Sequence, residues 1–282
     1  MIRTYIQMIC IADIYHKNCI EQILNNGVYD KNPRPKYKDG TPAFTKFITH
    51  YVETYDISKN EFPIITLRQI AIKNAIKEIL WIYQDQTSDL NVLKNKYNIH
   101  WWDDWESKTH PNTIGIRYGE TVKRYDLMNK LLDGIKNDPY GRRHIINLWQ
   151  ENDFNESDGL KPCAFQTLFS VRDNFLDLML IQRSSDLLVA SSINCIQYVA
   201  LQMMISKSCN LKPGKFTRVV NNLHIYDRHF ESAKIILNRE VGEQPILELN
   251  TNKTNFYEFT IDDFEIKNYK FQSPQIKFEL GI

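Results

Sequence analysis

The feature that most constrains this chain is residues 161–194, where reactive side chains interrupt apolar runs such as residues 175–181. They stand in three clusters: Lys161-Pro162-Cys163, Gln182-Arg183-Ser184-Ser185-Asp186 and Ser192-Ile193-Asn194. A lone cysteine is usually a small core residue, and a lone arginine is usually a solvated surface charge. A thiol, a guanidinium, hydroxyls, a carboxylate and an amide together indicate a site that holds an anion and attacks an electrophile.

Length, charge and cysteine count narrow the class of protein. The 282 residues are enough for one large domain or two small ones with a real core. A net charge of +1 gives no basic field for nucleic acid, so we expect no DNA partner. Five cysteines without tight spacing indicate neither a disulfide framework nor a zinc site. We therefore expect no metal and a reduced, cytoplasmic location.

Two further classes are not expected from the sequence. The first residues, 1–14, are apolar but meet Asp13 before a long hydrophobic region forms, and they lack a small-residue cleavage site. No apolar run is expected to reach the length of a membrane span, so we expect no membrane partner.

Hydrophobic spacing predicts both helices and strands. Helices are predicted over residues 14–24, 70–83, 126–135, 194–209 and 228–238. Strands are predicted over residues 43–55, 165–170, 175–181, 216–225, 256–266 and 275–280, with a hairpin turn at Arg172-Asp173-Asn174. Gly27 is predicted to end the first helix in the left-handed conformation. No linker-like composition shift and no internal repeat occur, so we expect one α+β domain.

Further motifs flank the reactive stretch in a fixed order. They are Asp39-Gly40-Thr41, Lys77-Glu78-Ile79-Leu80-Trp81, Trp102-Asp103-Asp104-Trp105, Ile114-Gly115-Ile116-Arg117-Tyr118-Gly119, Asp138-Pro139-Tyr140-Gly141-Arg142-Arg143 and Asn222-Leu223-His224-Ile225-Tyr226. Together with the three clusters, they resemble the folate-dependent thymidylate synthase family, which uses a cysteine nucleophile. The resemblance runs from about Ile20 to the C-terminus, so we expect an N-terminal extension over residues 1–19 and a catalytic domain over residues 20–282.

The resemblance implies a fold and an assembly. The expected fold is α+β, with one large mixed β-sheet flanked by helices and a homodimer formed through the sheet. In the family, two vicinal arginines reach the phosphate in the partner subunit's site, and Arg142 and Arg143 match them. Two adjacent side chains in an extended segment point to opposite sides, which suits two different targets.

The resemblance also implies a substrate, dUMP. Guanidinium groups and a serine hydroxyl suit a phosphate dianion, and His224 and Tyr226, two apart on one strand face, can hold a sugar hydroxyl. Asn194 offers one acceptor and one donor, which match N3–H and O4 of uracil. The positions carried over for nucleotide binding are Arg34, Arg142, Arg143, Arg183, Ser184, Ser185, Asp186, Asn194, His224 and Tyr226.

The implied chemistry begins at Cys163, whose thiolate adds to C6 of the pyrimidine. Pro162 shapes its approach, and Arg183 is expected to lower the pKa of the thiol by favouring the thiolate. The resulting enolate attacks the methylene of 5,10-methylenetetrahydrofolate, the co-substrate. Tyr118, or a water that it orients, removes the C5 proton. Glu78 faces the pyrimidine, where desolvation is expected to raise its pKa and let it shuttle protons.

The resemblance places the folate beside the nucleotide. Trp102 and Trp105 suit a half-open wall on which a flat pterin stacks. Asp186 is carried over as a second contact, and Gly281 belongs to the C-terminal residues that close over the folate in the family. The implied products are dTMP and dihydrofolate.

Departures from the family pattern leave a second enzyme open. The family usually has a glycine and then Pro-Phe before the base-reading asparagine, where this chain has Ala190, Ser192 and Ile193. A glycine lets the backbone approach a ligand closely or take a positive φ. A dUMP hydroxymethylase of the same family, in which water captures the exocyclic methylene, is therefore the alternative. Trp102 and Trp105 favour the methylase because an apolar wall excludes that water.

A third possibility is a non-catalytic nucleotide- or RNA-binding protein on the same scaffold. The presence of Cys163, Glu78, Tyr118 and Asn194 in one chain argues against it.

Overall fold

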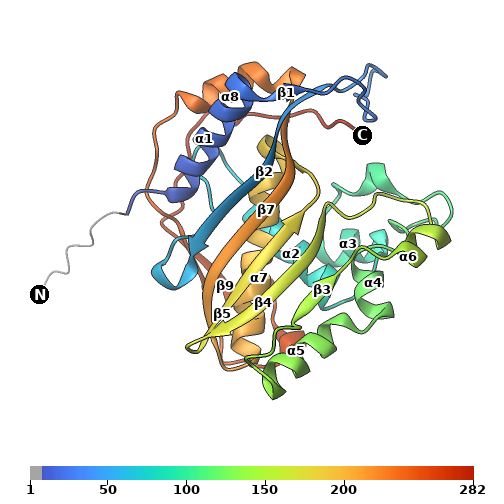
Figure 1. The fold of residues 1–282 in the computed structure, drawn as a ribbon, viewed down its shortest axis with the longest axis vertical. Coiled ribbons are helices and arrows are strands. Elements are labelled where there is room, and N and C mark those ends of the chain that lie inside the picture. Colours follow the sequence, from blue (N-terminus) through green and yellow to red (C-terminus); the bar gives the residue numbers. More distant parts are fainter. Residues whose placement is uncertain (1–7) are drawn as a thin grey trace, which may run out of the picture.

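A seven-stranded mixed sheet organises the computed structural model, which describes residues 8–282. The strand order is β1-β2-β7-β5-β4-β3, with β6 also paired to β7 (Figure 1). The strands are β1 Val28–Tyr29, β2 Thr45–Asp56, β3 Ile145–Asn147, β4 Ala164–Arg172, β5 Phe175–Gln182, β6 Ser185–Asp186 and β7 Lys212–Tyr226. The β5–β7 and β6–β7 pairs are parallel and the others antiparallel, so the predicted mixed sheet is confirmed.

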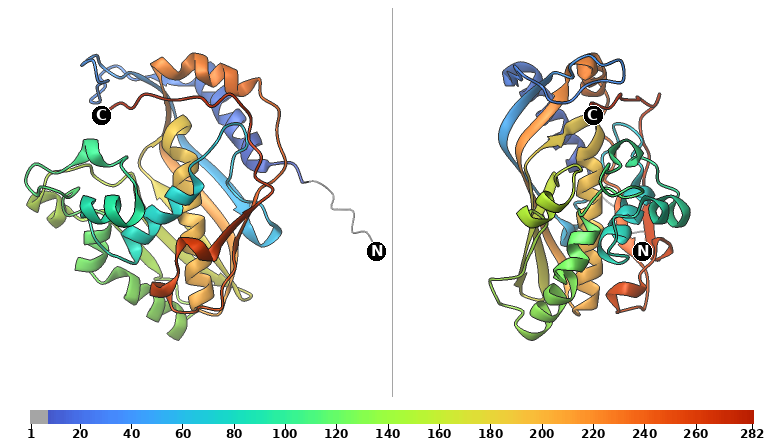
Figure 2. Two further views of the ribbon diagram at one scale, coloured as in Figure 1. Left: turned by 180° about the vertical axis from the view of Figure 1, so that it is seen from behind. Right: turned by 90° about the vertical axis from the view of Figure 1, so that its right-hand side faces the viewer.

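Helices lie against one face of this sheet. They are α1 Ile11–Asn26, α2 Ile72–Tyr83, α3 Leu90–Tyr97, α4 Gly119–Arg124, α5 Leu127–Asn137, α6 Glu151–Glu156, α7 Ser192–Ser208 and α8 Phe230–Leu237. The right-hand view in Figure 2 shows the sheet edge-on, with α7 and α2 stacked against one face of it. Apolar side chains on the opposite face are exposed: Val52 by 56%, Ile145 by 43% and Met179 by 40%.

The central helix is α7, which is apolar on nearly all sides and buried along most of its length. A π-helical turn, Leu187–Ser191, leads into it. By length and composition alone, Leu187–Ser208 could cross a membrane. This corrects the expectation that no apolar run reaches that length. However, 78% of the apolar window is buried inside the protein, so the stretch is a core helix.

The sequence predicted the main helices and the long strands, but three local predictions are wrong in whole or in part. Gly27 has φ −65°, because the chain runs straight from α1 into β1. A Cβ there would lie 2.4 Å from the Ile23 carbonyl oxygen, so close approach explains the glycine. Residues 275–280 form no strand, and the predicted strand over 256–266 exists only from Phe264, where β9 (Phe264–Lys267) pairs with β8 (Ile246–Leu249).

The predicted N-terminal extension falls partly outside the described residues, since residues 1–7 are not among them. Within residues 8–19, helix α1 crosses the expected boundary at residue 19 without a break. The buried Asp13 carboxylate of α1 accepts backbone hydrogen bonds from Thr66 at 2.7 Å and Gly242 at 3.0 Å. Helix α1 is therefore joined to the core from its first turn.

Candidate active site

Cys163 lies one residue before β4 and is partly buried. Arg183, one residue after β5, donates from Nη2 to the Cys163 Sγ at 3.4 Å. The same guanidinium donates to the carbonyls of Pro162 at 3.0 Å and Lys161 at 2.8 Å. The antiparallel pairing of β4 with β5 therefore holds the thiol and the guanidinium together.

The pKa of the Cys163 thiol is raised above its ordinary value. Burial is the largest cause, while the positive charges of Arg183 and Arg34 act in the lowering direction. The predicted effect of Arg183 on the pKa of the thiol is therefore right in direction, although burial has the larger effect. Desolvation outweighs both arginines, so burial disfavours the thiolate.

Tyr118 contacts the backbone of the nucleophile candidate. Its hydroxyl accepts a hydrogen bond from the Cys163 backbone N–H at 3.1 Å, and burial raises the pKa of Tyr118 well above the ordinary value. The residue has φ 45° and ψ −105°, a conformation that few non-glycine residues adopt. Such strain persists only where the surroundings over-determine it, and it is concentrated at functional sites.

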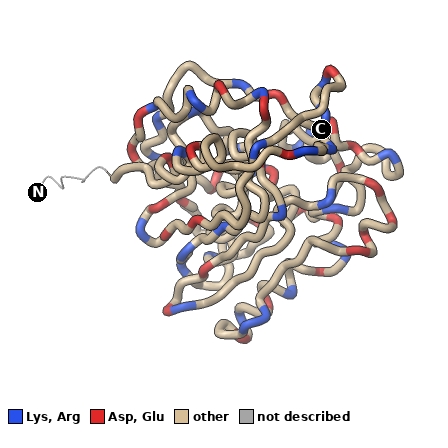
Figure 3. Tube along the Cα trace, turned by 45° about the horizontal axis from the view of Figure 1, so that its top comes forward, with Lys and Arg blue, Asp and Glu red and all other residues tan. Residues whose placement is uncertain are grey.

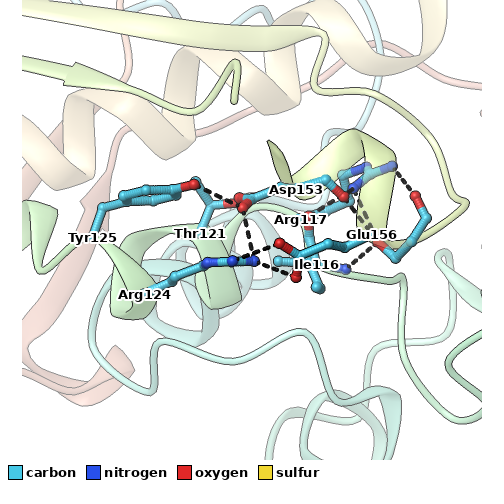
Figure 4. A network of polar contacts seen from close by, with 8 residues as sticks. Ile116, Arg117, Thr121, Arg124, Tyr125, Asp153 and Glu156 are labelled. Carbon is cyan, nitrogen blue, oxygen red and sulfur yellow. Dashed lines mark hydrogen bonds and ion pairs between the residues drawn. The ribbon is translucent and has the colours of Figure 1, made fainter. Parts of the chain in front are cut away.

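A buried carboxylate ties the segment of Tyr118 to the one that leads into Cys163 (Figure 4). Asp153 of α6 binds three side chains of α4 and its end: Thr121 at 2.6 Å, Tyr125 at 3.0 Å and Arg124 at 3.2 Å. The buried Arg117 donates to the carbonyls of Asp153 at 2.9 Å and Ser157 at 2.8 Å. These contacts join residues 117–125 to α6 and fix the placement of Tyr118.

Glu78 of α2 is buried, and two indoles bind its carboxylate. Trp101 donates at 2.6 Å and Trp102 at 2.9 Å. Burial nevertheless raises the pKa of Glu78 to about 7, which confirms the predicted direction. The Trp102 ring also lies 5.5 Å from that of Tyr118 and 5.8 Å from that of Trp105. The sequence interpretation missed Trp101, because the direction of an indole N–H cannot be read from an aromatic cluster.

Asn194, in the first turn of α7, has its amide held from both sides. Its Oδ1 accepts from Gln182 Nε2 at 3.0 Å, and its Nδ2 donates to Gln197 Oε1 at 2.9 Å. Both glutamines are buried. Neither was predicted as a partner, although the i,i+3 spacing of Asn194 and Gln197 on a helix was an available signal.

These contacts close into a ring of neighbouring side chains. Its members in order are Cys163, Arg183, Gln182, Asn194, Gln197, Glu78, Trp102 and Tyr118, which returns to Cys163. The step from Arg183 to Gln182 is a chain bond, and the step from Gln197 to Glu78 is a proximity through which the Gln197 amide acts on the pKa of Glu78, without a hydrogen bond. The ring brings Arg183 together with five other predicted site residues that are distant in the sequence: Glu78, Trp102, Tyr118, Cys163 and Asn194.

Beside the ring, β6 pairs Ser185 and Asp186 with Leu223 and His224 of β7. Ser184 Oγ lies 3.5 Å from His224 Nδ1. Burial lowers the pKa of His224 to about 4, so its imidazole is neutral. The Tyr226 ring lies 5.3 Å from that of His224.

Asp186 begins the π-helical turn, where its Oδ1 accepts from the backbone of Leu188 at 2.9 Å and Val189 at 3.2 Å. Burial raises the pKa of Asp186 to about 6. Ala190 lies within this helical turn, so the backbone there does not require the glycine that the family usually has.

The C-terminal residues meet the loop that carries Arg34. Lys36 and Ile282 exchange two backbone hydrogen bonds, of 2.8 and 2.9 Å. A Cβ at Gly281 would lie 2.7 Å from the Tyr226 ring, so the tail packs closely on that residue. Burial raises the pKa of both Cys163 and Tyr226, and the charge of the exposed Arg34 acts on both in the lowering direction, which places Arg34 on the same side of the protein as the site.

Arg142 and Arg143 do not join this site in their own chain. They precede β3, and the pairing of Ile145 with Leu168 puts them opposite the far end of β4 from Cys163. At about 3.3 Å per residue, that separation is roughly 20 Å. Both are exposed, and Arg143 lies 3.9 Å from Asp138.

Comparisons with known proteins agree on one family. Residues 14–282 match the family model described as thymidylate synthase. The chain is 53% identical over 278 residues to a thymidylate synthase of Lactococcus lactis subsp. cremoris (strain SK11), and 53% identical over 277 residues to one of Streptococcus pneumoniae (strain 70585). Each alignment covers 96% of this chain and 99% of the relative. The structure resembles a thermostable thymidylate synthase A from Bacillus subtilis with a TM-score of 0.89, at 34% identity, covering 96% and 99% of the two chains.

Proposed function

Because the chain belongs to the thymidylate synthase family, we propose that Cys163 adds to C6 of dUMP to begin the family's reaction. The activity is the methylation of dUMP by 5,10-methylenetetrahydrofolate, which gives dTMP and dihydrofolate. The relatives' shared name favours this product over the hydroxymethyl one. The observation that carries the role of Cys163 is its double contact, with Arg183 at the thiol and Tyr118 at the backbone N–H.

The nucleotide is held along the line of residues that follows β5. Arg183 and Ser184, with Arg34 from the facing loop, bind the phosphate through charge-assisted hydrogen bonds. His224 and Tyr226 bind the ribose hydroxyl, and the neutral His224 imidazole can donate or accept there. Ser185 and Asp186 shape the floor beside β7. Asn194 pairs with N3–H and O4 of the uracil ring.

The chain's own groups move the protons. The Cys163 thiol passes its proton to a neighbouring water as sulfur bonds to C6, which makes C5 the carbon nucleophile. Tyr118, or a water that it orients, takes the C5 proton after C5 has bonded to the methylene carbon. Glu78 exchanges a proton with the pyrimidine oxygen, and a pKa of about 7 suits a group that must both give and take a proton near neutrality. The bond from the methylene carbon to tetrahydrofolate then breaks, a hydride from tetrahydrofolate reduces the exocyclic methylene, and Cys163 leaves C6 as dTMP and dihydrofolate form.

Folate supplies the methylene carbon and the hydride when it is bound. Trp102 and Trp105 present indole faces for the flat pterin, and the Asp186 carboxylate has a second oxygen available for a ring N–H. Gly281 allows the tail to lie close over Tyr226 at this place.

We also propose that the chain is a cytoplasmic homodimer formed through the helix-free face of the sheet. The exposed Val52, Ile145 and Met179 on that face support it, since large apolar side chains left exposed on one face of a sheet suit an interaction surface. Arg142 and Arg143, remote from their own Cys163, would then serve the partner's phosphate site. Both signs of charge are interspersed along the chain (Figure 3), which suits a small anionic substrate better than DNA.

Product analysis tests the proposed function. Purified protein, dUMP and 5,10-methylenetetrahydrofolate are expected to give dTMP and dihydrofolate in equal amounts. The Cys163→Ala variant is expected to bind dUMP without turnover, because the phosphate and base contacts remain. Hydroxymethyl-dUMP, no product, or substantial turnover by Cys163→Ala would overturn the proposal.

A further inference from the structure

Gln197 is a buried glutamine, 3% exposed, one helical turn after Asn194. Its Oε1 accepts the Asn194 Nδ2 hydrogen at 2.9 Å. Its Nε2 is buried and has no hydrogen-bond partner among the described residues. Burial raises the pKa of Glu78 to about 7, and the nearby Gln197 amide acts in the lowering direction. Only an N–H donor stabilises a carboxylate, so the Nε2 end of Gln197 faces Glu78.

The Asn194 amide has only one favourable orientation between its two neighbours. A flipped amide would turn its oxygen toward the oxygen of Gln197 and its nitrogen toward the nitrogen of Gln182. Both hydrogen bonds would become contacts between like groups, and leaving buried polar groups unpaired costs about 1–3 kcal/mol. As held, the amide keeps one free lone pair and one free N–H for a ligand.

Gln197 is itself prevented from turning around. Reversing its amide would bring Oε1 against the Glu78 carboxyl, where two acceptors repel when Glu78 is ionised. Glu78 is in turn fixed by the indole donors of Trp101 and Trp102. Orientation therefore passes from the indoles to Glu78, then to Gln197, and finally to Asn194.

We propose that Gln197 is a positioning residue that sets base selectivity, by holding the Asn194 amide in the orientation that accepts uracil and rejects cytosine. Cytosine presents the reverse donor and acceptor pattern, and would need the flipped amide. The inference rests on the proposed reading of the base by Asn194. The inference adds Gln197, which acts on base selection through Asn194 rather than by contact with the nucleotide.

Two variants of Gln197 separate positioning from packing. Gln197→Met keeps the length but removes both polar atoms, and is expected to lower the ratio of kcat/KM for dUMP to that for dCMP about tenfold or more. Gln197→Glu keeps an acceptor for Asn194 but replaces the donor to Glu78 by a carboxyl. It is expected to retain the ratio while losing turnover. A role in packing alone would lower both specificity constants equally in each variant.

Gln202→Met is the matched control. Gln202 is a fully buried glutamine of the same helix, which donates to the carbonyls of Leu176 at 2.8 Å and Lys215 at 3.0 Å. Gln202→Met removes a buried amide. It is expected to lower the stability of the protein without changing the ratio of kcat/KM for dUMP to that for dCMP. An unchanged ratio in Gln197→Met, or an equal fall in Gln202→Met, would overturn the inference.

The same comparison can be made without turnover. The ratio of dissociation constants for dCMP and dUMP is measured with Cys163→Ala and with Cys163→Ala/Gln197→Met. A tenfold smaller preference in the double variant supports the inference, and an equal preference overturns it. If the parent protein made no dTMP, the proposed function would fail while this binding test still decided the role of Gln197.

Discussion

The hydroxyl of Tyr118 and the backbone N–H of Cys163 are joined by a hydrogen bond of 3.1 Å. The group proposed to remove the C5 proton is therefore positioned by the residue proposed to attack C6. The two residues are 45 apart in sequence, and the polar network around Asp153 holds their segments together. A substitution at either residue is therefore expected to alter the position of the other.

Tyr118→Phe removes that hydroxyl and is expected to lower kcat about 100-fold or more, the usual contribution of a positioned proton-transfer group. The KM for dUMP is expected to change much less. Steady-state kinetics measure both, with Tyr97→Phe as the control, since the Tyr97 hydroxyl binds Asp85 instead. A loss of kcat under tenfold would count against the role of Tyr118.

Arg183→Gln is expected to raise the pKa of the Cys163 thiol further, because an opposite charge that favours the thiolate is lost. The rate of iodoacetamide labelling at Cys163, followed by mass spectrometry against pH, measures it. Arg172→Gln changes an exposed arginine at the β4–β5 turn and is the control. An unchanged pH profile in Arg183→Gln would contradict the electrostatic role.

Glu78→Gln tests how the buried Glu78 carboxyl makes the free energy of unfolding depend on pH. The folded-state pKa of Glu78, about 7, lies above the ordinary value of 4.5, so its contribution to stability is full below pH 4.5 and is lost as pH rises through 7. Relative to the parent, the variant is expected to gain up to about 3 kcal/mol between pH 4.5 and pH 9. Urea unfolding across this range measures the difference. The exposed Glu240→Gln is the control, and a constant difference for Glu78→Gln would refute the assignment.

Asn194→Asp removes the N–H that O4 of uracil needs and adds an acceptor suited to cytosine. It is expected to lose activity on dUMP and to gain relative preference for dCMP. Specificity constants for both nucleotides decide the matter, and an unchanged ratio would mean that Asn194 does not read the base.

Subunit mixing tests the shared site. Inactive Cys163→Ala and inactive Arg142→Ala subunits, once exchanged, are expected to recover activity, since one site of the hybrid would have both groups. Cys163→Ala mixed with Arg183→Ala is the matched control and is expected to stay inactive, because each site then lacks a residue. No recovery in the first mixture, despite verified exchange, would contradict the shared site.

Much of the fold and the contents of the site were predictable from the sequence. The periodicity of α2 and the alternation of β5 depend on local burial, which a sequence records directly. The motif order predicted the residues that the structure gathers around Cys163. The resemblance, rather than spacing alone, gave Arg34 and Gly281 their proposed places.

What could not be predicted depends on tertiary contact. The net pKa of Cys163 depends on how deeply the thiol is buried, which no local pattern records. In the sequence, Gln197 is one polar residue among several in an apolar helix. Only the tertiary structure shows that Asn194 and Glu78 lie on either side of it. Residues 275–280 alternate like a strand, but no neighbouring strand pairs with them among the described residues.

The pairing of β2 with β7 has a consequence for folding. Thr45 lies opposite Tyr226, so the two longest strands come from opposite ends of the chain. Closing so long a loop costs entropy before any contact repays it, so folding is slow compared with that of a locally connected domain. During synthesis, β2 emerges long before its partner and exposes an unpaired edge. Charged residues on that strand, such as Lys46 and Asp56, then limit its aggregation with other nascent chains.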